Sequence, residues 1–242
     1  MAQDDSNLKY STLEKLIRDL TQAINGQYPR PWMADVTNPE RARIFIVGNN
    51  QATKFPVDWV GNYDRHIDAL FNRNGQSCRA LYYEMRGNKG PSRTRGNIDL
   101  LRGALTDVGI KDVLETNVIC YSTPRIKDLK LSEHRGGEER GKEIFLELLR
   151  IIRPEILIAY GAGARNELQG LFHGDIPPAP SNETSEVLWA RVRSKMEGTL
   201  YEPTIFPIQS LSSAKWNSWK NWAPGYFQNL ATECATLLDV KR

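Results

Sequence analysis

The residues best suited to chemistry are two adjacent asparagines, Asn49 and Asn50, which lie between Gly48 and Gln51. The residues before them, 43–47, are dominated by Ile, Phe and Val, as in a strand that is buried on both faces. In open α/β sheets the ligand sits beyond the carboxyl ends of such strands. The pattern therefore predicts two uncharged hydrogen-bonding groups at the mouth of a pocket. A plain turn is the alternative, because Asn tolerates left-handed backbone geometry.

A third amide, Asn117, lies inside another apolar stretch, Val113 to Tyr121, for which we expect a strand. A polar amide within a strand needs a hydrogen-bond partner or a pocket. One side-chain amide offers both a donor and an acceptor, so Asn117 could read the edge of a nucleobase. The alternative is a buried amide that is satisfied within the core.

Two further apolar stretches, 154–161 and 204–208, also predict strands that end in small or polar residues. The first turns through Gly161-Ala162-Gly163-Ala164 and gives Gly-x-Gly-x-x-Asn, a dinucleotide motif without its final glycine and without the acidic residue about twenty positions later. Close packing of a helix on a strand explains these glycines more simply, and we expect no cofactor. The second stretch runs into a small polar loop, 209–213.

Positive charge gathers in two segments, 86–102 and 125–130, with Asp99 the only acid in the first. Two basic segments beside strand ends would suit a phosphate backbone. A solvated surface is the alternative, because runs of charge are common on exposed faces.

The elements that must position these residues follow from periodicity. A capping box at 11–14, an apolar stripe and a stop at Gly26 predict an opening helix. Further helices are expected over 63–71, 98–108, 143–152 and 227–238, an additional strand over 80–85, and a flexible basic loop over 87–96. Strands that alternate with helices indicate an α/β fold with a mostly parallel sheet.

We expect a single-domain, three-layer α/β/α sandwich. Residues 1–40 would form an N-terminal helix and an extended connector packed on the core, because each proline near position 30 disfavours helix before it. Residues 41–242 would form the α/β domain itself. A chain of 242 residues is long enough for one sizeable core.

Composition excludes several classes of protein. The chain is 40% hydrophobic and 25% charged, with a net charge of +3, as in an ordinary globular protein. No apolar run approaches the roughly 20 residues needed to cross a bilayer, and the first residues lack the features of a signal peptide, so we expect a cytoplasmic protein without membrane contact. Three scattered cysteines and three histidines lack metal-ligand spacing, so we expect no bound metal. We also expect a monomer.

The four strand ends together resemble the uracil-DNA glycosylase superfamily. Its members carry a Gly-x-(Asp/Asn)-Pro or Gly-Glu-x-Pro-Gly motif after the first core strand, a downstream aromatic residue that stacks on the flipped base, a strand with a base-reading Asn, a Gly-x-x-Ala-like turn, and a His-Pro-Ser loop that wedges into the minor groove. The resembling segments here are Gly48-Asn49-Asn50, Trp59-Val60-Gly61, Thr116 to Cys120, Arg153 to Ala164, and 208–213. The resemblance spans roughly Arg43 to Lys215, and the order of its motifs is more specific than any one of them.

Three departures from the family pattern bear on the identity of the base more than on the fold. Gln51 and Ala52 replace the proline and glycine expected after Asn50. No histidine stands in the loop 208–213, and the iron–sulfur cysteines of the resembling branch are absent.

The resemblance implies a monofunctional DNA glycosylase that flips and excises uracil or, given the altered pocket, a modified pyrimidine such as one in modified viral DNA. Asn50 or Asn49 would orient the attacking water, because an amide cannot remove a proton at neutral pH. Gly48, Gln51, Trp59 and Asn117 would bind the flipped base. The DNA-binding residues would be Arg93, Arg95, Arg125, Gln209, Ser210, Leu211, Ser212, Ser213 and Lys215, with Leu211 as the wedge. Two alternatives remain open: a catalytically inactive DNA-binding module on the same fold, and a nucleoside or sugar-phosphate hydrolase.

Overall fold

The centre of the molecule is a five-stranded sheet in the order β4-β2-β5-β9-β7. The structure, a computed structural model, describes residues 11–33, 38–184, 186–198 and 200–240. Strand β2 (Ile44–Gln51) pairs in parallel with β4 (Val113–Ser122) and with β5 (Ile156–Tyr160), and β5 pairs in parallel with β9 (Thr204–Ile208). Only β7 (Ala190–Arg191), at the edge, is antiparallel to its neighbour among these strands. The predicted mostly parallel sheet is confirmed.

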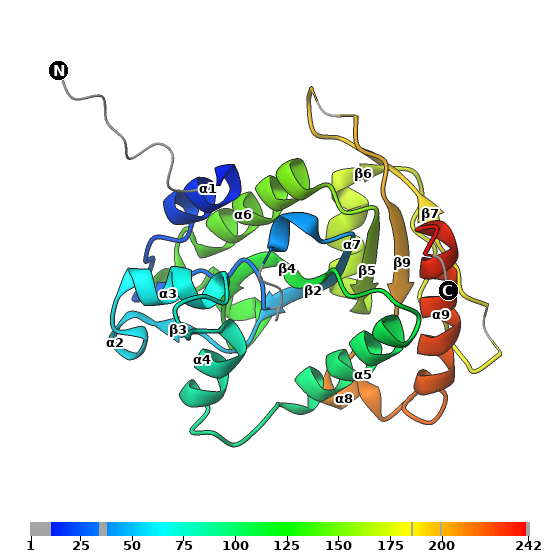
Figure 1. Cartoon of the computed structure of the whole chain (residues 1–242), viewed down its shortest axis with the longest axis horizontal. Helices are drawn as coiled ribbons and strands as arrows, with labels where there is room; N and C mark the ends of the chain where they lie inside the picture. Colours follow the sequence, from blue (N-terminus) through cyan, green and yellow to red (C-terminus); the bar gives the residue numbers. More distant parts are fainter. Residues whose placement is uncertain (1–10, 34–37, 185, 199, 241–242) are drawn as a thin grey trace.

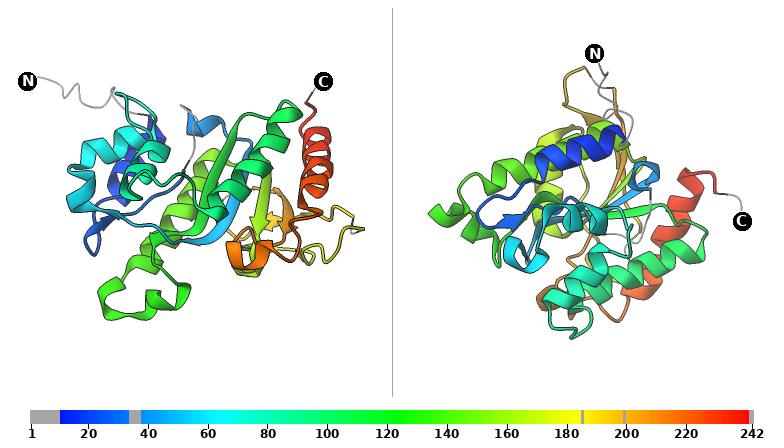
Figure 2. Two further views of the ribbon diagram at one scale, coloured as in Figure 1. Left: turned by 90° about the horizontal axis from the view of Figure 1, so that it is seen from below. Right: turned by 60° about the vertical axis from the view of Figure 1, so that its left-hand side comes forward.

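Helices cover both faces of this sheet and make three layers (Figure 1). The layer on one face contains α1 (Thr12–Leu20), α6 (Gly137–Ile152) and α7 (Gly161–Leu171). The other layer consists of α5 (Arg93–Asp107) and α9 (Ala223–Leu237), which pack side by side (Figure 2). Successive residues of β2 alternate between the two cores, because neighbouring side chains of a strand point to opposite faces.

The N-terminal segment belongs to the same core as the sheet. Leu13 and Ile17 of α1 are fully buried in the cluster that also holds Phe45, and α1 packs against α6. Ser11 caps α1 as predicted, with its Oγ accepting a hydrogen bond from Glu14 N at 3.2 Å. The predicted stop at position 26 is wrong, because the chain leaves the helix after Leu20 and forms a bridge between positions 24 and 27. The parts of the predicted segment at 1–10 and 34–37 lie outside the described residues.

The predicted strand over 80–85 is wrong, because this stretch forms α4 (Cys78–Met85). Ser77 caps the helix, with its Oγ accepting from Ala80 N at 3.0 Å. The apolar residues Cys78, Leu81 and Tyr82 are buried at positions i, i+3 and i+4, which is helical rather than strand spacing.

The predicted basic loop over 87–96 is shorter than expected. Ser92 caps α5, with its Oγ accepting from Arg95 N at 3.2 Å, so Arg93 and Arg95 lie in the first helical turn. The predicted helices over 63–71, 143–152 and 227–238 are confirmed as α3 (Tyr63–Leu70), α6 and α9, the last two beginning earlier than predicted. The remaining elements are β1 (Gln27–Tyr28), η2 (Pro39–Arg41), β3 (Phe55–Pro56), α2 (Val57–Val60), η3 (Ile126–Lys130), η4 (Ser132–His134), β6 (Phe172–His173), β8 (Arg193–Ser194) and α8 (Ser213–Trp216). None of the helices within the described ranges combines the length and the apolar character that crossing a membrane requires.

The strand order has a switch point between β2 and β5. From β2 the chain first moves to β4 on one side, and afterwards to β5 and β9 on the other. In doubly wound folds the ligand-binding crevice opens at such a point, outside the carboxyl ends of the strands. The residues at these ends are Asn49 and Asn50 on β2 and Tyr160 on β5.

Candidate active site

A cavity of about 570 Å³, here called the deep cavity, opens at this switch point. It draws residues from the ends of β2 and β5, from Asn117 within β4 and from the loop after β9, so the structure brings together residues from all four predicted strand regions. Asn49, Asn50, Asn117, Tyr160, Gly161, Gly163, Ser210, Ser212 and Lys215 are among the residues that line it.

Two glycines allow the side chains of the deep cavity to approach one another. A Cβ added at Gly163 would lie only 2.6 Å from Asn49 Nδ2. A Cβ added at Gly48 would collide with the Tyr160 hydroxyl and with Asn117 Oδ1. Gly48 therefore contributes by its lack of a side chain, and Gly163 allows α7 to pack closely against Asn49.

Two amide oxygens in the deep cavity have no protein partner. Asn49 Oδ1 and Asn117 Oδ1 are buried, and no described residue donates a hydrogen bond to either of them. Leaving a buried acceptor unsatisfied costs about 1–3 kcal/mol. Buried polar groups that stay unsatisfied beside a cavity are suited to binding a ligand, and the base-reading role of Asn117 stays a prediction.

Asn50 is held in one orientation by Thr123, which follows β4. Its Nδ2 donates to Thr123 Oγ1 at 3.0 Å, and Thr123 Oγ1 in turn donates to the carbonyl oxygen of Arg125 at 3.0 Å. The amide nitrogen of Asn50 is therefore engaged by the protein, and Asn50 Oδ1 can accept a hydrogen bond from a water or ligand.

Gln51 also lines the deep cavity, but its amide is committed to protein groups. Its Nε2 donates to the carbonyl oxygen of Arg30, and its Oε1 accepts from Ser122 Oγ at 3.2 Å. Gln51 therefore supports the wall of the cavity, whereas we predicted that it would bind the base.

The ionisable lining of the deep cavity is cationic apart from tyrosine. Arg30, Arg86, Arg95 and Lys215 contribute to it, and no acidic residue or histidine does so within the described chain. Glu115 lies behind the wall and forms ion pairs with Arg95 and, at 3.2 Å, with Arg102. Burial, and then the charge of Arg30, lowers the pKa of Arg95 to about 10, so its guanidinium stays charged at neutral pH. Arg95 is thus a largely buried helical residue of the wall instead of part of a loop, and its predicted contact with DNA stays a prediction.

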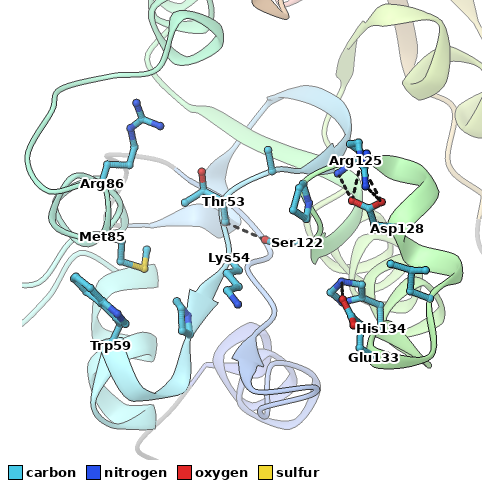
Figure 3. A pocket seen from close by; sticks show the side chains of 14 residues that line it. Thr53, Lys54, Trp59, Met85, Arg86, Ser122, Arg125, Asp128, Glu133 and His134 are labelled. Carbon is cyan, nitrogen blue, oxygen red and sulfur yellow. Dashed lines mark hydrogen bonds and ion pairs between the residues drawn. The ribbon is translucent and has the colours of Figure 1, made fainter.

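Trp59 lies in a second pocket of about 680 Å³, here called the outer groove, which adjoins the deep cavity at Ala52, Thr53 and Arg86. Trp59 and Met85 stand on one side of this groove and Arg125 on the other (Figure 3). The indole is 58% exposed. The structure therefore places the predicted stacking residue beside the deep cavity instead of inside it.

The remaining residues that we predicted to contact DNA differ in their burial and hydrogen bonding. Leu211 is fully buried and its carbonyl oxygen accepts from Asn97 Nδ2 at 2.8 Å, so the predicted wedge is wrong for this conformation. Gln209 Nε2 donates to the carbonyl oxygen of Pro180 at 2.6 Å. Ser210 and Ser212 line the deep cavity and share a hydrogen bond of 2.9 Å. The exposed residues are Arg93 at the start of α5, Arg125 in the outer groove, Ser213 at the start of α8, and Lys215.

Among the residues of the deep cavity that sequence reasoning missed, Arg30 and Tyr160 carry polar groups suited to a ligand. Tyr160 ends β5, and burial raises the pKa of its hydroxyl, which therefore remains a neutral donor. The available signal was an aromatic side chain at the last position of a buried strand. For Arg30 it was a cation between two prolines in a segment assigned only to packing.

No cluster of three or more potential metal ligands occurs in the described ranges. A scan of the chain against protein-family models gives no match, and a search of curated proteins gives none either.

Proposed function

We propose that this protein is a monofunctional DNA glycosylase of the uracil-DNA glycosylase superfamily, which flips and excises a modified pyrimidine in preference to uracil. One observation carries the proposal. Unpartnered or oriented amides converge in a cavity at the switch point, and the charges around them are positive. A phosphate backbone and an anionic leaving group both favour such surroundings.

The lining dictates the type of mechanism. Without a carboxylate or histidine among the described lining residues, the deep cavity offers no obvious general base or carboxylate nucleophile. The bond between the sugar carbon and the base breaks first, and its electron pair leaves with the base. Water held by Asn50 Oδ1 then adds to the cationic sugar and passes its surplus proton to solvent. Positioning and electrostatics lower the barrier.

Asn117 and Tyr160 are the groups that would recognise the base. Flipping a base costs a few kcal/mol of lost stacking and pairing, which the pocket must offset. Asn117 Oδ1, buried and without a partner, can accept an N–H from the edge of the base, and the Tyr160 hydroxyl lies beside it above Gly48. A cavity of about 570 Å³ also leaves space for a substituent on the pyrimidine ring.

The outer groove supplies a surface for the nucleotides next to the flipped base. An exposed indole accompanied by Lys54, Arg86 and Arg125 combines a stacking surface with positive charge. Proteins that bind single strands use this combination without reading sequence.

An abasic-site assay tests the proposal. Oligonucleotides that carry uracil or a 5-substituted uracil or cytosine are incubated with the protein, and abasic sites are cleaved by alkali. We expect cleavage of at least one modified substrate by the wild type and by Asn166→Ala, an exposed asparagine on α7, and little by Asn50→Ala.

Two other results would replace the proposal. Tight DNA binding without release of any base would indicate a binding module. Release of bases from free nucleosides, with an affinity that does not respond to salt, would indicate a small-molecule hydrolase, because contacts to phosphates give steep salt dependence.

A further inference from the structure

Arg30 is a buried cation without a carboxylate partner among the described residues. Its side chain belongs to a residue that is only 6% exposed, and neither Nε nor Nη1 finds a hydrogen-bond acceptor within the described chain. It lines the deep cavity and also an adjoining recess of about 20 Å³, together with Asn117 and Tyr160. A buried charge is costly unless it is paired, so this guanidinium is suited to an anionic ligand.

The neighbouring arginines provide a contrast. Arg79, Arg95 and Arg102 all lie within ion-pair distance of Glu115, which is itself buried. Arg79 pairs with Asp99 as well, at 2.8 Å. The carboxylates of this cluster are therefore shared by three guanidinium groups. Among the described residues, Arg30 differs from the other lining cations, Arg86 and Lys215, because it is buried.

The backbone around Arg30 is fixed on both sides. Arg30 N donates to the carbonyl oxygen of Cys120 at 3.0 Å, and Thr116 Oγ1 donates to that of Pro31 at 2.6 Å. The carbonyl oxygen of Pro29 lies 3.0 Å from His66 Nε2. Burial lowers the pKa of His66 to about 3, so the neutral ring can donate this bond throughout the physiological range.

The guanidinium itself lies over the ring of Phe55, with its carbon 4.7 Å from the ring centre. Stacking on an aromatic face and a pinned backbone preorganise the N–H groups of Arg30. A donor that is preorganised before the reaction costs no rearrangement when charge develops.

We infer that Arg30 is a catalytic residue that binds the departing pyrimidine as its anion. This inference rests on the proposed function. When the bond between the sugar carbon and the ring nitrogen breaks, both electrons go to the base, and the negative charge spreads over its ring nitrogens and carbonyl oxygens. Hydrogen bonds from Arg30 stabilise that charge. Water adds to the sugar carbon and loses a proton to solvent, and the free base later takes a proton from solvent.

A series of leaving groups tests this role. DNA substrates carrying 5-substituted uracils of increasing acidity are compared in single-turnover reactions of the wild type and Arg30→Gln. We expect a loss of about 10²–10³-fold for the least acidic base and a much smaller loss for the most acidic, because a good leaving group needs less stabilisation. The matched control is Arg43→Gln, which removes a positive charge at the opposite ends of the strands, where Arg43 Nε pairs with Glu155 at 2.6 Å.

A binding measurement gives a readout that does not depend on turnover. 5-Nitrouracil is an anion near neutral pH, whereas uracil is neutral. Arg30→Gln should weaken binding of 5-nitrouracil at least tenfold and change that of uracil little. Arg30→Lys keeps the charge and should retain most of the binding of the anion. It replaces Arg30→Gln in this measurement if thermal unfolding shows that Arg30→Gln is not folded.

The outcomes separate the inference from the function on which it rests. If no DNA substrate loses its base with the wild type, the proposed function is wrong, and the inference goes with it. If the wild type releases bases but Arg30→Gln loses rate equally across the series, or not at all, only the role of Arg30 is overturned. The same holds if Arg30→Lys binds 5-nitrouracil no more tightly than uracil.

Discussion

The deep cavity and the outer groove are neighbours with opposite properties. In the deep cavity, Asn49, Asn117 and Arg30 keep buried polar atoms that no described residue satisfies. In the outer groove, Trp59 is largely exposed, and Arg125 has its own carboxylate at 3.0 Å on Asp128. The contrast separates two proposed tasks. The buried, unsatisfied polar atoms of the deep cavity suit chemistry on a single base. The exposed aromatic side chain of the outer groove suits binding of a DNA strand.

The origins of the two pockets explain this difference. The deep cavity is built around the ends of β2 and β5, two strands that lie inside the five-stranded sheet. The outer groove is built largely from short elements and loops, among them α2 and η3. Mutations in the deep cavity should therefore change the rate of base release, and mutations in the outer groove should change the affinity for DNA.

The largest effect is expected from Asn50→Ala. Removing the oriented acceptor should lower the single-turnover rate of base release by about 10²–10³-fold, because the attacking water loses its position. The dissociation constant for DNA, measured by fluorescence anisotropy, should stay unchanged. A loss of affinity as large as the loss of rate would contradict the division of tasks.

Gly48→Ala should damage the deep cavity through packing. The added methyl group meets the Tyr160 hydroxyl and Asn117 Oδ1, and overpacking of this kind costs about 1–3 kcal/mol of unfolding free energy. Urea denaturation measures the loss, and base release should fall with it. Gly103→Ala in α5 is the control, because its methyl group meets nothing within 4 Å and should stabilise the helix by up to about 1 kcal/mol.

Much of the deep cavity was predictable from the sequence, because parallel strands end at the same edge of a sheet. The run 204–208 became β9 with the expected bounds, and Asn50, Asn117 and Ser210 met as expected. Arg30 was not predictable in this way. It precedes the first core strand, and only tertiary hydrogen bonds bring it against β4.

The errors also have physical causes. The resemblance conveyed the order of Trp59 and Leu211 but not the paths of their loops, so one lies outside the deep cavity and the other inside the core. Over 80–85 the apolar and aromatic run was compatible with either element, and the decisive Ser77 cap stood outside it. Short apolar runs do not distinguish strand from helix by periodicity alone.

Trp59→Ala sharpens the comparison from the other side. Loss of a stacking surface should weaken DNA binding by about 1–3 kcal/mol, measured by anisotropy on a single-stranded oligonucleotide. The rate at saturating protein and the melting temperature should not change, because the indole is exposed. A fall in the saturated rate would show that Trp59 touches the flipped base after all.

The smallest effect is expected from Lys54→Ala, which removes one exposed charge from the outer groove. Its mark should be a decrease of about one in the slope of log affinity against log salt, with only a modest change in affinity at any one salt concentration. Lys111→Ala, at the amino end of β4, is the matched control and should leave the slope unaltered. Equal slopes for both variants would mean that the backbone of DNA avoids this groove.

The three cysteines give the molecule a built-in reporter of its own integrity. All are reduced and buried, and burial raises the pKa of Cys120 to about 12, so almost none of it is thiolate at neutral pH. Alkylating reagents attack the thiolate form, so Cys120 should react only when local or global unfolding exposes it to solvent. The Sγ atom of Cys120 lies 3.6 Å from the carbonyl oxygen of Pro31, next to Arg30 in the chain. The rate of labelling at Cys120 would therefore report how often this part of the wall opens, without any engineered probe.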